Sequence, residues 1–442
     1  MDKHLLRLRT PLAALVLLAS ACGASSSTTP TSAPASAPPA APAAIVAEPP
    51  PPPVEPVEPV EPVEPVEPVE PPAPVAEGKD FINDARAFYG AVACGPGAPP
   101  PSLDEGIVSK HCAEMTKRYE RFRARYVVPA GAFFAKVRPA ELPDKVVYPF
   151  GGGDLGSALV TFPNATEITT ISLEHAGDPT RLVSLRRAEL RAALSEFRAA
   201  VRGLLTNNDS TSENMRKLER GGIPGQLSFH LTGAAALGFE PVSLRFFTLE
   251  DDGAIHYLGA EEIDALARVR AKRKKGTWVD TDFSAAFTNM ELVLRNTADP
   301  AAPLVVHRHF AANLANNGFR GSSLEKHLLA KGTMAAMTKA ASYLLWSQNF
   351  AGIRDYLLAH AAWMASDATG IPAANARRAG FRQTTYGKFM GAFLPDAPVS
   401  VNETMVKLWA DQPLRKLAFR YGYPDSQGNV HLLITAPIQG RP

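Results

Sequence analysis

Residues 24–78 carry so much proline that they cannot form a packed core. They include SSSTTPTSAPASAPPAAPAAIVAEPPPPP and then six Val-Glu-Pro triplets that run from Val54 to Pro71. This composition offers little apolar surface to bury, and each proline removes a backbone N–H donor. In polyproline II conformation the triplets alone would span roughly 55 Å, with their glutamates along one edge. We therefore interpret the segment as a stiff, charged, disordered spacer; the alternative is a docking strip for a basic partner.

The segment before the spacer has the layout of an export signal. Lys3, Arg7 and Arg9 precede the apolar run PLAALVLLASA, which is too short to span a bilayer. The sequence LASAC, which ends at Cys22, resembles a bacterial lipobox. This resemblance implies cleavage before Cys22 and a diacylglycerol on its sulfur, and Gly23 in the next position implies delivery to the outer membrane. An ordinary signal peptide followed by a chance cysteine is the alternative.

The remaining cysteines predict a disulfide. The chain contains three cysteines, and lipidation of Cys22 would leave Cys94 and Cys112. Because an exported protein enters an oxidising compartment, we expect these two to form a bridge that closes the loop containing GPGAPPPS. Two buried free thiols are the alternative.

These features divide the chain into four parts. We expect a signal peptide at 1–21, a lipid-anchored spacer at 22–78, a helical cap with the disulfide at 79–142, and an α/β globular domain at 143–442. The formal net charge is +2, and the longest basic run is only Lys272–Lys275. With no zinc spacing and no basic stripe interleaved with aromatic residues, we predict no nucleic-acid partner.

Hydrophobic periodicity predicts a mixed α/β fold for the globular part. Helices are expected at 80–93, 110–127, 182–205, 212–222, 261–272 and 349–363. Strands are expected at 145–150 and 167–174, in hairpins at 241–258 and 417–437, and in a pair formed by 287–296 and 303–313. This order predicts a mixed, partly parallel sheet with a Rossmann-like strand–turn–helix start and antiparallel hairpins.

A glycine-rich turn follows the first expected strand. Gly151, Gly153 and Gly156 have the spacing Gly-x-Gly-x-x-Gly, and Glu174 closes the next apolar run, as in a dinucleotide-binding turn. However, a proline soon after these glycines shortens the following helix, and Asp154 would repel a phosphate. An exported protein also meets little free NAD or S-adenosylmethionine. We therefore predict no cofactor and interpret the turn as a tight strand-to-helix crossover that uses glycine for backbone reasons.

Side chains at the ends of the expected strands are candidates for catalysis. Asp154, Glu174 and His175 fall at the carboxyl ends of strands, where ligands of open α/β sheets gather. Together with Lys339 they could perform acid–base chemistry. The alternative is that Asp154 caps the short helix and Glu174 faces solvent.

The lysine and histidine patterns carry weaker signals. Lys339 lies near Ser342 and Tyr343, yet neither Ser-x-x-Lys nor Gly-x-Ser-x-Gly occurs, which favours packing around a surface lysine. His307 and His309 share one face of a strand, but no second ligand spacing accompanies them, so we predict no metal. We expect His230 to be a hydrogen-bonded core histidine.

Three blocks of the sequence resemble, in the same order, an uncharacterised family of bacterial exported proteins and lipoproteins. They are VVYPFGGGDLGSALVTFPNATEITTISLE, KAASYLLWSQNFAGIRDYLLAHAAWMASDATGIP and FRQTTYGKFMGAF, and the similarity extends over residues 143–437. The chain departs from the family pattern at Ala340, where the family has Ser, and at Ala368, where it has Asp. The resemblance supplies no activity. It implies a common cleft near Tyr148, Asp154, Glu174, Lys339, Tyr343 and Asp367. Apart from the resemblance, Gly151 and Gly153 of the turn are candidate binding residues.

From the sequence we expect a lipoprotein anchored in the outer membrane through Cys22. Its leading function is a binding or interaction module for a partner in the cell envelope. An envelope hydrolase or transferase that uses Asp154, Glu174, His175 and Lys339 is the alternative.

Overall fold

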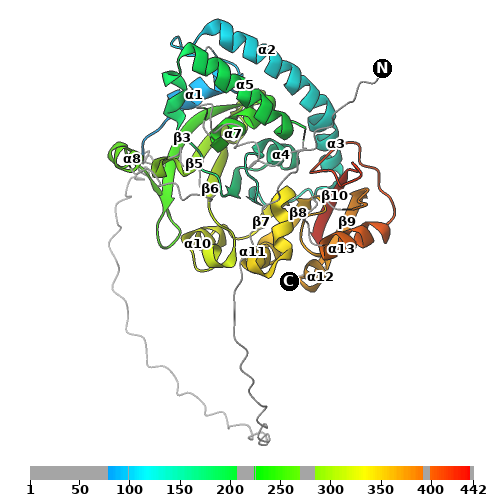
Figure 1. The fold of residues 1–442 in the computed structure, drawn as a ribbon. Helices are drawn as coiled ribbons and strands as arrows, with labels where there is room; N and C mark the ends of the chain where they lie inside the picture. Colours follow the sequence, from blue (N-terminus) through cyan, green and yellow to red (C-terminus); the bar gives the residue numbers. More distant parts are fainter. Residues whose placement is uncertain are drawn as a thin grey trace, which may run out of the picture. The chain divides into compact units, whose positions relative to one another are not determined.

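The computed structural model describes residues 78–97, 99–206, 223, 225–268, 284–391 and 399–438 (Figure 1). The export signal, the spacer up to residue 77, the helix expected at 212–222 and the basic run 272–275 lie outside these residues. In the described part no helix is both long and apolar enough to cross a bilayer.

Ten strands of the described part form a single mixed sheet in the order β4-β3-β5-β6-β2-β1-β7-β8-β10-β9. The strands are β1 (Lys145–Pro149), β2 (Glu167–Ser172), β3 (Phe239–Leu249), β4 (Ile255–Tyr257), β5 (Asn289–Asn296), β6 (Val305–Ala311), β7 (Met334–Thr338), β8 (Ala361–Ser366), β9 (Phe381–Gly387) and β10 (His431–Pro437). The mixed α/β fold expected from the sequence is therefore confirmed.

The helices connect the strands and cover the sheet. The α-helices are α1 (Ile82–Ala91), α2 (Glu105–Phe122), α3 (Val128–Val137), α4 (Leu155–Thr161), α5 (Arg187–Leu204), α7 (Gly225–Ala236), α8 (Ala260–Ala267), α9 (Asn316–Phe319), α10 (Ser323–Leu329), α11 (Ala351–His360), α12 (Ala373–Arg378) and α13 (Val399–Ala410). Five short helices of other types are η1 (Arg123–Val127), η2 (Pro179–Ser184), η3 (Ala285–Phe287), η4 (Ala340–Trp346) and η5 (Gln348–Phe350).

The middle of the sheet is parallel and doubly wound. Strands β6, β2, β1, β7 and β8 run parallel, and the chain moves outward from β1 to β2 on one side and from β7 to β8 on the other. The order therefore reverses between β1 and β7, which is the point where open α/β sheets bind ligands at the strand ends. Antiparallel β3, β4 and β5 extend one edge, and antiparallel β10 joins β8 to β9 at the other.

Both faces of the parallel strands are buried, as their short apolar sequences require. Val146 of β1 belongs to the core beneath α1, α2, α5 and α7, whereas its neighbour Val147 belongs to the core beneath α10 and α11. Figure 1 shows these two helical layers on opposite sides of the sheet. The alternation places the ends of β1 and β7 in the interior of the domain.

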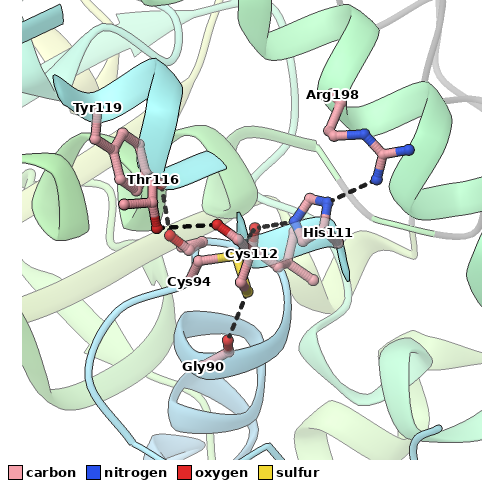
Figure 2. Close-up of a disulfide and its surroundings, with 9 residues drawn as sticks. Gly90, Cys94, His111, Cys112, Thr116, Tyr119 and Arg198 are labelled. Atoms are coloured by element: carbon pink, nitrogen blue, oxygen red, sulfur yellow. Dashed lines mark hydrogen bonds between the residues drawn. A yellow bond between two sulfur atoms is a disulfide. The ribbon is translucent and has the colours of Figure 1, made fainter. Parts of the chain in front are cut away.

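The disulfide predicted between Cys94 and Cys112 is present and joins the chain after α1 to α2 (Figure 2). Amphipathic α5, with Leu190, Leu194 and Phe197 fully buried, packs on α2. The residues 79–142 are thus mostly helical. The second helix, expected to end at residue 127, is followed directly by α3, which ends at Val137.

The helical segment that begins with α2 continues past Pro129 because the residues before this proline form a π-helix. A proline inside an α-helix cannot donate to the carbonyl four residues before it, and its ring clashes with that carbonyl. Residues Arg123–Val127 form a π-helix, in which the N–H of Val128 donates to the carbonyl of Arg123. Helical residues therefore follow one another without a gap from α2 through η1 to α3.

Two predictions about the last third of the chain are wrong. The helix expected at 349–363 ends at His360, and Ala361 starts the buried strand β8. The hairpin expected at 417–437 contains only β10, because β10 is paired on both sides by β8 and β9. The first half is a loop in which the Asp425 carboxylate accepts the backbone N–H groups of Met390, Gln427 and Asn429.

Candidate functional site

An arginine-lined pocket opens between α2, the end of α5 and the segment before β10. Its volume is about 1230 Å³. Apolar lining comes from side chains such as Leu205, Leu417 and Val430. The charged lining consists of Arg118, Arg121, Arg125, Arg202 and Arg420, and among the described residues no acidic side chain lines the pocket.

Helical spacing explains why arginines and aromatic rings separate here. Arg118, Arg121 and Arg125 are three and four residues apart, so they lie along one side of the helical rod. Phe122 and Tyr126 point into the core, where their rings stack at 5.3 Å and are 5 % and 3 % exposed. The pocket therefore presents guanidinium groups, and the two aromatic rings beneath them are almost completely buried.

The positive charges of the pocket are close enough to act on one another. Burial lowers the pKa of the Arg118 guanidinium, and the charges of Arg198, Arg121 and Arg202 lower it further, against a smaller opposing effect of Glu114. This mutual repulsion raises the energy of the empty pocket, and a ligand with negative charge would relieve it.

Tyr126 connects the floor of the pocket to a buried polar cluster. Its hydroxyl is buried near Ser157 and Thr161 of α4, yet no described residue forms a well-aligned hydrogen bond with it. Burial raises the pKa of this phenol, and the nearby charge of Asp154 adds to the effect. A neutral phenol thus separates the pocket from a carboxylate below.

The buried cluster lies where β1 and β7 end. The ammonium of Lys339 donates to Oδ2 of Asp154 at 2.6 Å and to the Ser157 hydroxyl at 3.1 Å. The Tyr148 hydroxyl donates to Oδ2 of Asp154 at 3.1 Å, while Oδ1 accepts the N–H of Ser157 at 3.3 Å. Asp154 is therefore the N-cap of α4 and the partner of Lys339 at once. Lys339 thus joins the end of β7 to the first turn of α4.

Asp367 and Tyr421 complete this cluster. Asp367 follows β8, is fully buried, and accepts the backbone N–H of Thr369 at 2.9 Å. Lys339 lies 5.1 Å from the ring centre of Tyr421. Burial raises the pKa of Tyr148 and of Tyr421, and the charges of Asp154 and Asp367 raise both further. Tyr343, in η4 directly after Lys339, is half-buried.

Glu174 and His175 lie on the other side of the glycine turn. Oε2 of Glu174 accepts from the Gln226 amide at 3.3 Å, and its backbone carbonyl accepts from His309 at 2.8 Å. Nδ1 of His175 lies 3.4 Å from the hydroxyl oxygen of Thr288. Burial lowers the pKa of His175. The structure thus brings Tyr148, Asp154, Lys339 and Asp367 to one cluster, whereas Glu174 and His175 belong to a neighbouring one.

The glycines of the turn make room for helix α7. A Cβ on Gly153 would lie 2.5 Å from Cβ of Phe229 and 2.9 Å from Oε1 of Gln226. A Cβ on Gly233 would lie 2.8 Å from the backbone nitrogen of Gly156. Helix α7 therefore fills the space between the glycine turn and Glu174, and the turn serves close packing of backbone against backbone.

Comparison of the chain with protein-family models, with curated proteins and with solved structures finds no match. The geometry of the site is thus the ground on which its function is inferred.

The sequence reasoning missed the residues that line the pocket. The run RYERFRARY, residues 118–126, does interleave arginines with aromatic residues, contrary to the expectation above that no such stripe exists. The helical spacing of its arginines was the available signal. The rings of Phe122 and Tyr126 are buried, and the half-buried Tyr119 donates its hydroxyl to the Ala93 carbonyl, so these rings do not form the exposed stacking surface that binds single-stranded nucleic acid. Tyr421 gave no sequence signal, because it reaches the cluster from a loop far along the chain.

Three buried histidines, His230, His307 and His309, form a separate group at β6. The rings of His230 and His307 are 4.3 Å apart, and Thr170 lies between His307 and His309 at 2.9 and 3.1 Å. His230 is in the core as expected, but neither of its ring nitrogens has a hydrogen-bond partner among the described residues.

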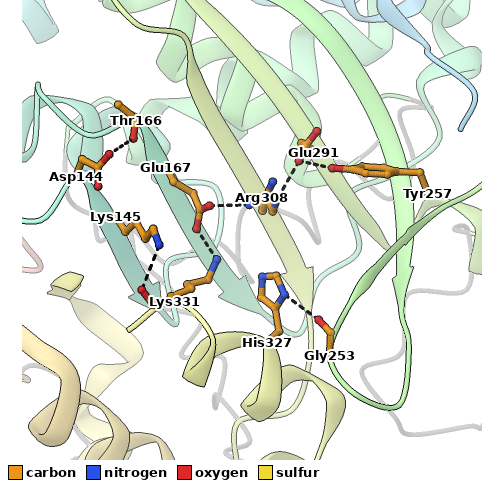
Figure 3. Close-up of polar contacts among 10 residues, drawn as sticks. All are labelled: Asp144, Lys145, Thr166, Glu167, Gly253, Tyr257, Glu291, Arg308, His327 and Lys331. Carbon is orange, nitrogen blue, oxygen red and sulfur yellow. Dashed lines mark hydrogen bonds and ion pairs between the residues drawn. The ribbon is translucent and has the colours of Figure 1, made fainter. Parts of the chain in front are cut away.

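On the opposite face of the sheet, ion pairs link the strands β2, β5 and β6 (Figure 3). Arg308 of β6 bridges Glu167 at 2.7 Å and Glu291 at 2.8 Å, and Lys331 also pairs with Glu167. Burial alone would raise the pKa of Glu167, but the cations of Lys331 and Arg308 outweigh it and hold the pKa below its usual value. Since each charge has a partner, this network fixes the register of β2, β5 and β6.

Proposed function

We propose that this chain is a lipid-anchored envelope protein whose folded part binds an anionic ligand in the arginine-lined pocket. The observation that carries the proposal is the convergence of five arginines from three separate segments around one pocket with no acidic lining in the described part. Planar guanidinium groups bind carboxylate and phosphate oxygens with two parallel hydrogen bonds.

The size and lining of the pocket favour a ligand with several anionic groups. Its volume of about 1230 Å³ exceeds that of most pockets for small molecules. Arginines spaced along one helical ridge can each meet a different charge of an extended ligand. A phosphorylated or carboxylated oligosaccharide of the envelope combines these properties, so we propose this class of ligand.

An envelope hydrolase or transferase is the weaker proposal. Asp154 and Lys339 neutralise each other beneath the surface, with side chains 14 % and 6 % exposed. Glu174 and His175 are bonded to other elements, and none of these four residues lines the pocket. A catalytic proposal would therefore have to begin with a rearrangement of this cluster.

Isothermal titration of the full chain with inorganic pyrophosphate and with citrate tests the binding proposal. The double variant Arg121→Ala/Arg125→Ala should weaken binding at least roughly tenfold, because a hydrogen bond to a charged group contributes about 1.5–3 kcal/mol. The matched control is Arg377→Ala/Arg378→Ala, which removes the same charge from the exposed end of α12. Equal losses in both double variants would show that the charge acts non-specifically, and no binding by the unaltered chain would refute the proposal.

The anchor is tested separately. Replacing Cys22 by Ala should move the protein from the membrane fraction to the soluble fraction of cells that express it. Retention of the variant in the membrane fraction would refute lipidation of Cys22 as the anchor.

A further inference from the structure

A short chain of hydrogen bonds ties α2 to α5 directly beside the arginine pocket (Figure 2). On α2, the buried His111 has Nε2 2.8 Å from the carbonyl oxygen of Val92 and Nδ1 3.0 Å from Nη1 of Arg198 on α5. In return, Nη1 of Arg118 on α2 donates to the backbone carbonyl of Arg198. Two bonds in opposite directions therefore clamp the two helices together.

Chemistry fixes the tautomer of His111 in this clamp. A guanidinium group can only donate, so Nδ1 must be the bare nitrogen that accepts from Arg198. A carbonyl can only accept, so Nε2 carries the hydrogen that it donates to Val92. Burial lowers the pKa of His111 to about 4, and the charges of Arg198 and Arg118 act in the same direction. The imidazole is therefore neutral, as the clamp requires, at neutral pH.

The clamp lies close to the arginines that line the pocket. His111 and Arg118 are two helical turns apart on α2, and Arg198 and Arg202 are one turn apart on α5, so each pair shares a helical face. The distance between the α2 arginines and Arg202 depends on how α2 is held against α5. The clamp is thus placed to set the spacing of the guanidinium groups across the pocket.

The disulfide lies next to the hydrogen bond between His111 and the Val92 carbonyl. Cys112 follows His111 in the sequence, and Cys94 lies two residues after Val92, so the bridge keeps the imidazole beside the carbonyl that it binds. The Tyr119 hydroxyl, which donates to the Ala93 carbonyl at 2.5 Å, adds a further tie to the same segment. The position of His111 is therefore fixed independently of any ligand.

We propose that His111 is a positioning residue for the pocket: by holding Arg198 it sets α2 against α5 so that their arginines meet a ligand with two neighbouring phosphate groups. This inference rests on the proposed function. A single carboxylate carries one negative charge beside the neighbouring cations Arg118, Arg121 and Arg202, whereas a diphosphate carries more negative charge on two groups, each of which can meet a guanidinium group. Guanidinium groups fixed before binding lose less conformational entropy when the ligand arrives.

Two amide substitutions separate positioning from simple packing. In His111→Asn the amide oxygen stands near Nδ1 and can still accept from Arg198, but the bond to Val92 is lost. In His111→Gln the amide nitrogen stands near Nε2 and can still donate to Val92, but the acceptor for Arg198 is lost. Each variant loses one hydrogen bond, so their losses of melting temperature should be similar.

The experiment titrates the full chain and both variants with inorganic pyrophosphate at neutral pH and records their thermal melting. Positioning predicts that H111N binds within about threefold of the unaltered chain and that H111Q binds roughly tenfold more weakly. It also predicts that R198M matches H111Q and that the double variant H111Q/R198M is no weaker than either. Affinities of H111Q equal to the unaltered chain, or losses that follow melting temperature in both variants, would overturn the positioning role. Failure of the unaltered chain to bind pyrophosphate would instead overturn the proposed function itself.

Discussion

The ammonium nitrogen of Lys339 lies 2.6 Å from Oδ2 of Asp154, although the two residues are 185 positions apart. One follows β1 and the other follows β7, so the contact closes the point at which the order of the parallel strands reverses. Both side chains are mostly buried, and they form an ion pair.

Removing one partner of this pair should destabilise the fold strongly. Lys339→Met leaves the Asp154 carboxylate buried without its cation, which costs about 3–5 kcal/mol of unfolding free energy. Asp154→Asn keeps a capping side chain on α4 but removes the negative charge that lies 2.6 Å from the lysine. The double variant should cost clearly less than the sum of the two single variants. Urea unfolding of all four proteins measures this, and strictly additive losses would contradict a direct pairing.

The glycines beneath α7 should not tolerate a methyl group. Gly153→Ala and Gly233→Ala place a Cβ within 2.5 Å of Phe229 and 2.8 Å of Gly156, so each should cost about 1–3 kcal/mol through overpacking. Gly131 in α3 is the matched control, since a Cβ there meets nothing within 4 Å. Gly131→Ala should be neutral or stabilising by up to about 1 kcal/mol, because alanine favours the helix. Equal melting temperatures for Gly131→Ala and Gly153→Ala would argue against close packing of α7 on the turn.

Reduction of the disulfide should lower stability without abolishing the fold of the sheet. Cys94 and Cys112 are 18 residues apart, and a loop of that length corresponds to about 3 kcal/mol in the loop-entropy treatment. Melting curves with and without dithiothreitol measure the loss, and the variant Cys94→Ser/Cys112→Ser should behave like the reduced protein. Two titratable thiols in the untreated protein would contradict the bridge.

Stability should fall as the pH drops below about 6.5. Burial lowers the pKa of His309 to about 4, and it also lowers the pKa of His230 and of His307. An unfolded histidine has a pKa of about 6.5, and His309 in the folded protein has a pKa of about 4. Between these two values the unfolded chain binds a proton that the folded chain does not, so stability rises with pH in this window. For His309 alone the loss approaches about 3 kcal/mol as the pH falls from 6.5 to 4.

Replacing one of these histidines tests the sign. In His307→Gln the amide can keep the bond to Thr170, and one fewer group takes up a proton on unfolding. The dependence of unfolding free energy on pH between 5 and 6.5, a window that largely avoids carboxylate titration, should therefore decrease by about 1 kcal/mol per pH unit on average. An unchanged slope would show that His307 is not neutral in the folded protein.

Local patterns were sufficient for much of this fold. The 3.6-residue spacing of Leu190, Leu194 and Phe197 predicts α5, and the turn at Asp252-Gly253 predicts the β3–β4 hairpin, since neighbouring residues determine both. The disulfide followed from the cysteine count together with the expected compartment. Strand β8 was missed because AAWMAS is buried on both faces and lacks alternation, so it continues the apolar character of α11.

The site was harder to foresee than the fold. The resemblance grouped Tyr148, Asp154, Glu174, Lys339, Tyr343 and Asp367. The structure places Tyr148, Asp154, Lys339 and Asp367 together because the ends of β1, β7 and β8 meet, whereas Glu174 lies in a neighbouring cluster with Gln226 and His309. The pocket depends on α2, α5 and the loop at Arg420, and only tertiary packing brings these three segments together. No spacing in the sequence records such a contact.

The insertion of β10 between β8 and β9 has a consequence for how the protein assembles. Strand β9 pairs with β10, and β10 in turn pairs with β8. During synthesis β9 therefore emerges with no place yet on the sheet, and it must wait until β10, more than forty residues later, has docked on β8. The edge of β8 stays open until then, so a chaperone that shields this edge would act at the moment of greatest risk.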